Sequence, residues 1–354
     1  MMDRVVRVLV VDDSAYVRKV IKQMLSRSPF IDVVGTARDG EEGLTLVQEL
    51  HPDVVTLDLI MPGIGGLGFI REQMSRTPVP TVIVSISNET SQLVLDALDA
   101  GAIDFVQKPS ALATEKVFEM ADELIEKVKA AGSVRLTAVK SVTATGEAKP
   151  KPEPRPKSSL DIVVIGISTG GPQALKHLVP CFPSDFPLPI AIVMHMPVGY
   201  TELYAQRLNE LCALDVSEAQ EGTEIRQGYV LLAPAGRHLT FNRTKSAIVA
   251  HLDARPFDTL HRPSVDVLFR SAAETFGSGV LGVVMTGMGD DGKEGSSYIK
   301  SNGGIVFAEA EESCAVFGMP RAIIEAGLAT RTVPLQQLAE AIQEAAYGEN
   351  SHRR

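Results

Sequence analysis

The sequence predicts an α/β protein of two domains, each an open, mostly parallel sheet with helices on both faces. Strand-like runs alternate with amphipathic helical patterns on both sides of a proline-rich segment, which is typical of parallel sheets. With 354 residues the chain is long enough for two domains of ordinary size. Its apolar content of 45% is enough to fill their cores, which excludes a globally disordered chain.

A proline-rich segment divides the chain. Within residues 135–158 prolines alternate with charged residues, and large apolar side chains are scarce. Such a stretch favours extended, solvated chain that buries no core. We expect a first domain over residues 1–130, a Pro/Lys-rich linker over 131–158, a second domain over 159–347 and a frayed tail over 348–354. A plain spacer is the favoured role of the linker, and docking to a partner is the alternative.

Composition and charge exclude several classes of protein. The formal net charge of −10 disfavours a nucleic-acid binder, which would carry a basic stripe or domain. No run approaches the roughly 18 apolar residues of a membrane span, and the first residues show no signal-peptide pattern. The cysteines are far apart and form no CxxC pair: Cys181, Cys212 and Cys314. We expect a cytoplasmic protein with no membrane insertion, no nucleic-acid partner and no disulfide framework.

Polar residues follow the strand-like runs of the first domain, at the edge where open parallel sheets bind ligands. They are Asp12, Asp13, Asp58, Ser85 and Lys108. Three carboxylates with no fixed partner would repel one another unless a divalent cation joined them. We expect Asp12, Asp13 and Asp58 to hold Mg²⁺, and Asp58 to accept a phosphoryl group as an acyl phosphate. Lys108 would pair with the new charge, and Ser85 would hydrogen-bond a phosphoryl oxygen.

Taken alone, each of these residues has a simpler interpretation, such as a helix cap for the aspartate pair or a turn carboxylate for Asp58. Their joint placement at the ends of different strands favours the site. The segments VVDDS, LDLIMPGIGG, VIVSIS and DFVQKP resemble, in this order, the receiver domain of two-component response regulators over residues 1–125. The resemblance implies a flavodoxin-like fold, Asp58 as phosphoacceptor and a histidine kinase as phosphodonor.

The second domain opens with a strand that runs into a glycine-rich turn, DIVVIGISTGGP. A dinucleotide-binding turn would have glycine where Ser168 stands and an acid where His195 ends the next strand, and a Walker lysine is also missing. The stretch GISTG instead fits G-x-S-x-G, in which small neighbours permit a turn that exposes a serine nucleophile. Serine alone is a weak nucleophile, so a base and an orienting acid must follow.

Candidates for the base and the acid follow other strands of this domain. His195 is preferred as base over His238 and His261, because it closes the apolar strand that comes next in the chain. The acid would be Asp290 or Asp291, just past the strand GVLGVVMTGMG, although a turn or cation-binding pair remains the alternative. The order serine, histidine, aspartate differs from that of α/β-hydrolases, but chain order does not matter to the chemistry.

A second resemblance covers residues 159–347. The motifs GISTGGP, MHMP, APAGRH, HRPSVDVLF, MTGMGDDG and VFGMPRAI are similar to the catalytic domain of chemotaxis receptor methylesterases. This implies a doubly wound, Rossmann-like esterase domain with Ser168 as nucleophile, His195 as base and Asp291 as orienting acid. It also implies an oxyanion site formed by backbone N–H groups, with Met288 as the first candidate and Thr169 as the second.

The two resemblances together imply a phosphorylation-activated hydrolase. It would demethylate methylglutamate, and deamidate glutamine, on methylated chemoreceptors, through a serine acyl-enzyme. A chemotaxis histidine kinase would supply the phosphate, and the unphosphorylated receiver domain would inhibit the esterase. Mg²⁺ would serve receiver phosphorylation, and the ester reaction would need no cofactor. The alternative is a response regulator with a non-catalytic binding output domain. A degenerate esterase that acts only as a scaffold has no support, because every proposed catalytic position is filled.

Overall fold

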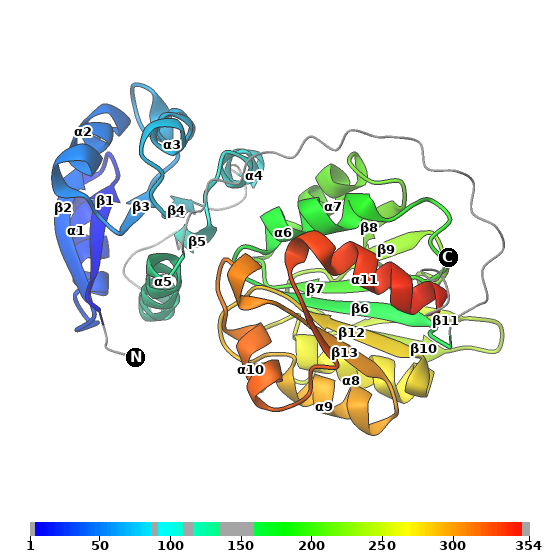
Figure 1. Ribbon diagram of the computed structural model, residues 1–354. Helices are drawn as coiled ribbons and strands as arrows, with labels where there is room; N and C mark the ends of the chain where they lie inside the picture. Colours follow the sequence, from blue (N-terminus) through cyan, green and yellow to red (C-terminus); the bar gives the residue numbers. More distant parts are fainter. Residues whose placement is uncertain (1–3, 87–90, 109–115, 135–158, 349–354) are drawn as a thin grey trace, which may run out of the picture. The chain divides into compact units, whose positions relative to one another are not determined.

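The computed structural model describes residues 4–86, 91–108, 116–134 and 159–348 (Figure 1). Contacts divide the chain into two compact units, Met1–Leu136 and Thr137–Arg354. The predicted fold class is confirmed, because each unit is built on an open parallel sheet with helices on both faces. The tail after Gly348 and most of the expected linker lie outside the described residues. The last helix of the first unit continues to Gly132, so the described start of that linker segment is helical.

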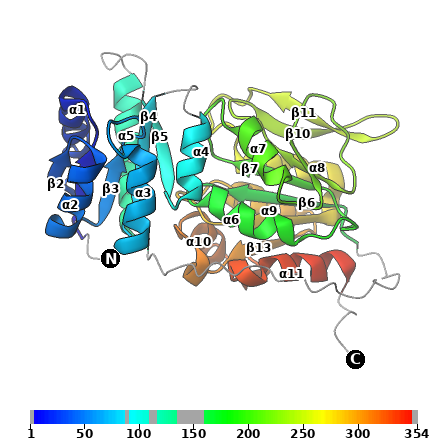
Figure 2. The same ribbon diagram turned by 90° about the horizontal axis from the view of Figure 1, so that it is seen from above.

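The first unit has a five-stranded parallel sheet in the order β2-β1-β3-β4-β5, which is the flavodoxin-like order. Its strands are β1 (Val6–Val11), β2 (Ile31–Ala37), β3 (Val54–Leu57), β4 (Thr81–Ile86) and β5 (Asp104–Lys108). Helices on one face contact each other and the sheet: α1 (Ala15–Leu25) and α5 (Lys116–Gly132). The other face carries α2 (Gly40–Leu50), α3 (Gly65–Arg76) and α4 (Ser91–Asp99) (Figure 2).

Local sequence explains why the strands of this sheet end in polar residues. The centre of β1 is apolar and fully buried from Val8 to Val10, so polar side chains are excluded until the strand leaves the sheet at Asp12. There the Ser14 hydroxyl accepts the Val17 N–H and starts α1. The carboxyl ends of β1, β3, β4 and β5 therefore gather polar groups at one edge of the sheet.

The second unit has a seven-stranded parallel sheet in the order β14-β13-β12-β6-β7-β9-β8. Its strands are β6 (Ile162–Ile167), β7 (Ile190–Met194), β8 (Asp215–Glu218), β9 (Tyr229–Leu232), β12 (Val280–Val284), β13 (Ile305–Glu309) and β14 (Arg331–Val333). An antiparallel hairpin forms a separate two-stranded sheet from β10 (His238–Arg243) and β11 (Ile248–Asp253). This hairpin was not anticipated from the sequence.

Helices cover both faces of the seven-stranded sheet (Figure 1). One face carries α6 (Gly171–Leu178), α7 (Thr201–Asn209) and α11 (Leu335–Tyr347). The other carries α8 (Val265–Phe276), α9 (Lys293–Ser301) and α10 (Met319–Glu325). Short 3₁₀ turns complete the unit: η1 (Val179–Cys181), η2 (Gly277–Gly279) and η3 (Glu311–Ser313). No helix among the described residues is long and apolar enough to cross a membrane.

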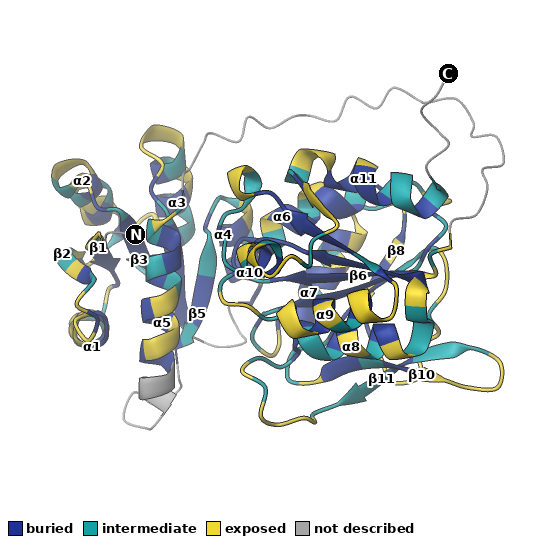
Figure 3. Ribbon diagram, turned by 60° about the horizontal axis from the view of Figure 1, so that its bottom comes forward, coloured by how far each residue is buried: buried dark blue, intermediate teal, exposed yellow. Residues whose placement is uncertain are grey.

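The central strands of this sheet determine where the site lies. All six residues of β6 are buried, and Figure 3 shows the central strands dark blue throughout. A Cβ added at Gly166 would stand 2.2 Å from Val265, so glycine is required for α8 to pack against β6. Because β7, β6 and β12 are neighbours and parallel, the segments that follow them start at the same edge of the sheet.

Candidate active site and phosphoacceptor site

Ser168 stands at the first position after β6, in a turn that the glycines make possible. Its N–H donates to the Thr286 carbonyl across the sheet (3.0 Å), and its own carbonyl accepts the Gly171 N–H (2.7 Å). Gly170 has φ +81, and a Cβ there would lie 2.5 Å from the Ala315 Cβ. A larger residue at Gly170 would therefore be strained and crowded, which explains the glycine-rich turn that presents the serine.

His195 stands directly after β7 and faces Ser168. Its backbone N–H donates to the Ile167 carbonyl (3.2 Å), which continues the parallel pairing of the two strands by one residue. The ring Nδ1 lies 3.1 Å from the Ser168 Oγ, within hydrogen-bonding distance. Only 9% of the His195 side chain is exposed, so its ring is largely shielded from water.

Asp291 completes the arrangement from the turn between β12 and α9. Its Oδ2 lies 2.8 Å from the His195 Nε2. Burial raises the pKa of Asp291, but hydrogen bonds from His195 and from the Val265 and Asp266 amides outweigh it and hold that pKa well below its usual range. Asp291 is therefore ionised at neutral pH. The neighbouring Asp290 is exposed.

The orientation of the imidazole follows from this carboxylate. An ionised carboxylate only accepts hydrogen bonds, so Nε2 carries the proton and Nδ1 turns its lone pair toward the Ser168 hydroxyl. In the chymotrypsin-type triad the roles are the reverse, with Nε2 at the serine and Nδ1 at the aspartate. Either nitrogen can act as the base, because both are ring nitrogens of the same imidazole.

A turn after β12 lies against the nucleophile turn. The Thr286 hydroxyl donates to the Thr169 carbonyl (2.9 Å), and a Cβ added at Gly287 would stand 2.8 Å from the Ser168 Cβ. The next residue, Met288, is half-buried, and its amide has no acceptor within the described part of the chain. Of the two oxyanion candidates, Thr169 is buried in the nucleophile turn itself.

Glu309, at the end of β13, fixes this turn through a hydrogen bond to its backbone. The sequence analysis did not identify this residue. Its side chain is fully buried and accepts the Thr286 N–H (2.8 Å) and the Ser313 hydroxyl (3.0 Å). Burial raises the pKa of Glu309 against the effect of these hydrogen bonds. The available signal was an acid closing the strand-like run IVFAE, at the same sheet edge as the other site residues.

The two rival histidines have other positions. The His261 ring stacks on the His195 ring, with centroids 3.9 Å apart and planes at 24°. His238 is fully buried; its Nδ1 accepts the Ser264 N–H (3.2 Å) and its Nε2 faces the Pro256 carbonyl (3.1 Å). Because both ring nitrogens of His238 are used to hold the loop before α8, that histidine is structural.

His238 should make the stability of this domain depend on pH. Burial lowers the pKa of His238 below its ordinary value of 6.5, so the neutral ring is favoured in the folded state. Its contribution to stability is present above pH 6.5 and is lost as the pH falls through the lowered pKa. We expect His238→Gln to lose less unfolding free energy than the wild type between pH 7.5 and 5, measured by urea denaturation. The exposed His177 gives a control, His177→Gln, and an identical pH slope in wild type and His238→Gln would contradict this role.

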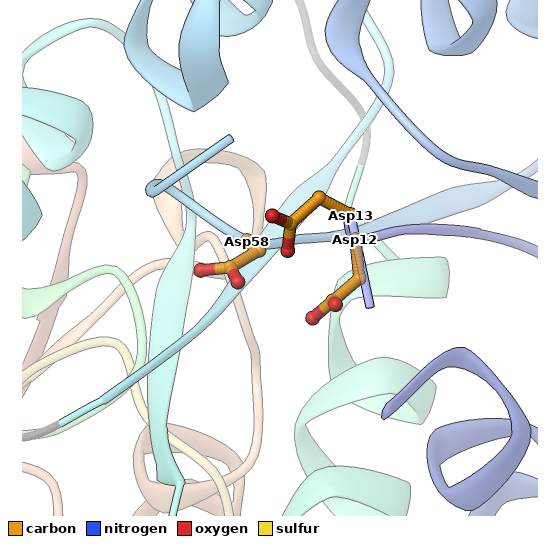
Figure 4. Close-up of side chains that lie close together, drawn as sticks. All are labelled: Asp12, Asp13 and Asp58. Carbon is orange, nitrogen blue, oxygen red and sulfur yellow. The ribbon is translucent and has the colours of Figure 1, made fainter. Parts of the chain in front are cut away.

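In the first unit, three carboxylates meet at the edge of the five-stranded sheet. Asp12 and Asp13 follow β1 and Asp58 follows β3, and each offers an oxygen within 4.8 Å of the others (Figure 4). Asp12 and Asp58 are buried, whereas Asp13 is exposed. Oxygen ligands in this number suit a hard divalent cation such as Mg²⁺ or Ca²⁺.

Lys108 and Ser85 close the same site. The Lys108 Nζ lies 2.7 Å from the Asp12 Oδ2 and 2.7 Å from the Asp58 Oδ2, so one buried ammonium bridges two carboxylates. Burial and the nearby Asp58 charge raise the pKa of Asp12, and Lys108 lowers it in opposition. Ser85 is buried near the end of β4, the strand between β3 and β5. The structure thus places all five predicted residues of the first domain at one edge of its sheet.

A receiver-type fold with an acidic cluster, joined to an α/β domain with a serine–histidine–aspartate chain, defines a response regulator with an enzymatic output domain. Two protein-family models match the sequence: CheB methylesterase over residues 163–342 and the response regulator receiver domain over residues 8–120. The chain belongs to the CheB methylesterase family, and its second domain is a methylesterase domain.

Individual relatives match along nearly the whole chain. Protein-glutamate methylesterase/protein-glutamine glutaminase 5 of Myxococcus xanthus (strain DK1622) is 51% identical over 332 residues, which cover 94% of this chain and 95% of the relative. A protein of the same name in Pyrococcus horikoshii, without the numeral, is 40% identical and covers 98% of this chain and 95% of its own. Among solved structures, the Thermotoga maritima CheB methylesterase catalytic domain has a TM-score of 0.51 at 41% identity, covering 52% of this chain and 98% of its own.

Proposed function

We propose that this protein is a phosphorylation-activated hydrolase that removes methyl groups from methylglutamate, and amide nitrogen from glutamine, on chemoreceptors. The observation that carries the proposal is the hydrogen-bonded chain from the Ser168 Oγ through His195 to Asp291. The names of the relatives, protein-glutamate methylesterase/protein-glutamine glutaminase, support the substrate class. A non-catalytic output domain is not favoured, because the second unit matches the CheB methylesterase family model and brings a hydroxyl, an imidazole and a carboxylate within hydrogen-bonding distance.

The proposed first half-reaction is acyl transfer to serine. The His195 Nδ1 takes the Ser168 proton while the Oγ attacks the ester carbonyl carbon, and the ionised Asp291 stabilises the imidazolium that forms. The Met288 amide, with Thr169 as second candidate, would donate to the developing oxyanion. The tetrahedral intermediate collapses when the proton on Nδ1 passes to the methoxy oxygen, and methanol leaves.

The second half-reaction regenerates the enzyme. Water gives a proton to the His195 Nδ1 and attacks the acyl carbon, and the Ser168 oxygen leaves with that proton to restore the hydroxyl. The glutamate carboxylate is released. For a glutamine side chain the same steps release ammonia in place of methanol. All groups that these steps use belong to the chain or to water, so we propose no cofactor for the ester reaction.

In the first domain we propose that Asp58 is the phosphoacceptor and that a chemotaxis histidine kinase is the phosphodonor. Asp12, Asp13 and Asp58 would hold Mg²⁺, and their cluster of carboxylate oxygens fits that ion. The ion would neutralise charge on the incoming phosphoryl group. Lys108 already bridges two of the carboxylates and would pair with a phosphoryl oxygen, and the buried Ser85 would hydrogen-bond another.

We also propose domain limits and location. The receiver would span residues 1–130, the linker 131–158, the methylesterase domain 159–347 and the tail 348–354. The division of contacts between residues 136 and 137, inside the proposed linker, supports these limits. The protein would act in the cytoplasm without inserting into membranes or binding nucleic acid, which agrees with its net charge of −10.

Replacing Asp58 by asparagine should abolish regulation by phosphorylation and leave the hydrolytic site of the second domain intact. We expect Asp58→Asn to take up no phosphoryl group from acetyl phosphate and to show a hydrolytic rate that ignores this donor. In the wild type, driving a mostly inhibited enzyme to a mostly active one requires a bias of about 5.5 kcal/mol, so the donor should raise the rate strongly. The measurement is methanol release from membranes with methylated receptors, with and without the donor.

The matched control is Asp53→Asn, an aspartate before β3 that pairs with Arg4 and lies outside the carboxylate cluster. It should respond to the donor as the wild type does. A wild-type rate that does not respond to the donor would contradict the switch and leave the hydrolase assignment standing. Absence of methanol release from the wild type under both conditions would contradict the hydrolase itself.

A further inference from the structure

Asp291 and Asp266 each accept hydrogen bonds from the backbone of the segment that carries the other. Asp291, before α9, accepts the N–H groups of Val265 (2.8 Å) and Asp266 (2.9 Å) at the start of α8. In return the Asp266 Oδ1 accepts the N–H groups of Gly292 (2.9 Å) and Gly295 (2.7 Å) at the start of α9. Each helix start is thus capped by a carboxylate from the other segment, which satisfies amides that have no partner inside their own helix.

The starts of α8 and α9 are packed so closely that these hydrogen bonds can change little in geometry. A Cβ added at Gly295 would stand 2.5 Å from the Phe269 Cβ, and a Cβ at Gly292 would stand 2.8 Å from Val265. Gly292 also has φ +98, a conformation that other residues rarely adopt. The two helix starts are therefore in backbone-to-backbone proximity, and the turn that carries Asp291 is fixed in part by the bonds to Asp266.

We propose that Asp266 is a positioning residue for hydrolysis, which acts through Asp291 by fixing the 291–295 turn and by adding negative charge behind the His195–Asp291 pair. The inference rests on the proposed function, in which Asp291 orients His195. It concerns a carboxylate that does not touch Ser168 or His195. Its two acceptor bonds and its exchange of caps with Asp291 distinguish it from an ordinary helix-start aspartate.

The ionisation of Asp266 gives this role a signature. Burial, together with the charges of Asp291 and Glu294, raises the pKa of Asp266 to about 7 against the opposing hydrogen bonds from the Gly295 and Gly292 amides. Strands β6 and β12 bring only apolar residues to α8, and His195 pairs with Asp291 rather than with Asp266. On β10, the His238 ring faces the Ser264 N–H and the Pro256 carbonyl, and Arg243 donates to the Thr275 carbonyl near the other end of α8. Asp290 and Lys293 flank the turn and are exposed.

The two pH effects of this carboxylate have opposite signs. Above about pH 7 Asp266 is ionised, accepts the two amides more strongly and favours the imidazolium of the transition state, so the rate should rise through this pH. Since the folded-state pKa is raised from 3.8, the contribution of Asp266 to stability is present below pH 3.8 and is lost as the pH rises through about 7. A residue with a purely structural role would not couple a gain in rate to a loss of stability.

Asp266→Asn tests the charge, because an amide oxygen can still accept both glycine N–H groups. In the full-length protein with saturating phosphodonor, we expect its kcat at pH 8.5 to fall about tenfold with little change in KM. Its pH–rate profile should lose the component near pH 7, and its unfolding free energy should decline less than that of the wild type between about pH 4.5 and 7. Glu274→Gln, an exposed acid of α8 that pairs with Arg270, is the matched control and should match the wild type.

Glu294→Gln tests the ionisation of Asp266 without changing Asp266 itself. Removing this like charge should move the component near pH 7 to lower pH and leave the plateau rate unchanged. The inference would be overturned if Asp266→Asn had the same kcat and pH–rate profile as the wild type. If Asp266→Asn fails to fold, an unshifted pH–rate profile of Glu294→Gln would overturn it instead. If Ser168→Ala remained active, the proposed function itself would fail; a dead Ser168→Ala beside an unaffected Asp266→Asn would remove this inference alone.

Discussion

Replacing Ser168 by alanine should lower the rate of methyl ester hydrolysis by about 10⁵-fold or more and leave the protein folded. The Ser168 Oγ faces the His195 Nδ1 at 3.1 Å and can give it a proton. The backbone bonds of the turn to Thr286 and Gly171 do not involve the hydroxyl, so its geometry should persist. Methanol release from methylated receptor membranes measures the rate, and thermal unfolding measures the fold.

The control for this experiment is Ser301→Ala, an exposed serine at the end of α9 whose hydroxyl bonds only within its own helix. It should hydrolyse the substrate at the wild-type rate. Hydrolysis by Ser168→Ala within about tenfold of the wild type would mean that the nucleophile is elsewhere, since removing the nucleophile of a serine protease lowers kcat on the order of 10⁶-fold.

Asp291→Asn should lower kcat by about 10⁴-fold and also destabilise the domain by about 2–4 kcal/mol. One Asp291 oxygen accepts from His195 and Val265, and the other from the Ser264 hydroxyl and the Asp266 amide. An asparagine must turn its NH₂ toward one of these pairs, so in either orientation one buried backbone N–H, that of Val265 or that of Asp266, loses its acceptor. If the NH₂ faces His195, it also forces the ring into the wrong tautomer.

Asp290→Asn is the matched control because it removes the neighbouring, exposed carboxylate. Its hydrolytic rate and its urea midpoint should stay close to those of the wild type. The pair of variants separates the two aspartates, which sequence spacing alone left open. A large loss of rate in Asp290→Asn with an active Asp291→Asn would reverse the assignment of the orienting acid.

Much of the fold was accessible from sequence because strands here end where polar residues begin. The apolar runs of β1, β6 and β7 are bounded by Asp12, Ser168 and His195, so each strand end marked its own candidate. Parallel pairing then predicted a common edge, and the structure brings Ser168 and His195 within 3.1 Å. The hairpin β10–β11 was not predicted, because its two strands pair with each other in a sheet that is separate from the main one.

Other parts of the site depend on contacts that no local pattern contains. The ring orientation of His195 is decided by Asp291, 96 residues away along the chain. The choice of His195 over His238 rested on strand order, whereas the structural reason is that Ser264 and Pro256 occupy both nitrogens of His238. Glu309 gave no distinctive local signal, since its partner Thr286 lies in the turn after β12, 23 residues earlier in the chain.

The exchanged caps of α8 and α9 have a consequence for homologous sequences. Because Asp291 also ties two helices together, natural selection for a folded domain would retain it after hydrolysis is lost. The Ser168 hydroxyl makes no comparable contribution to the fold. In a divergent relative, a serine at the position of Ser168 would therefore be diagnostic of catalysis, and an aspartate at the position of Asp291 would be diagnostic only of the scaffold.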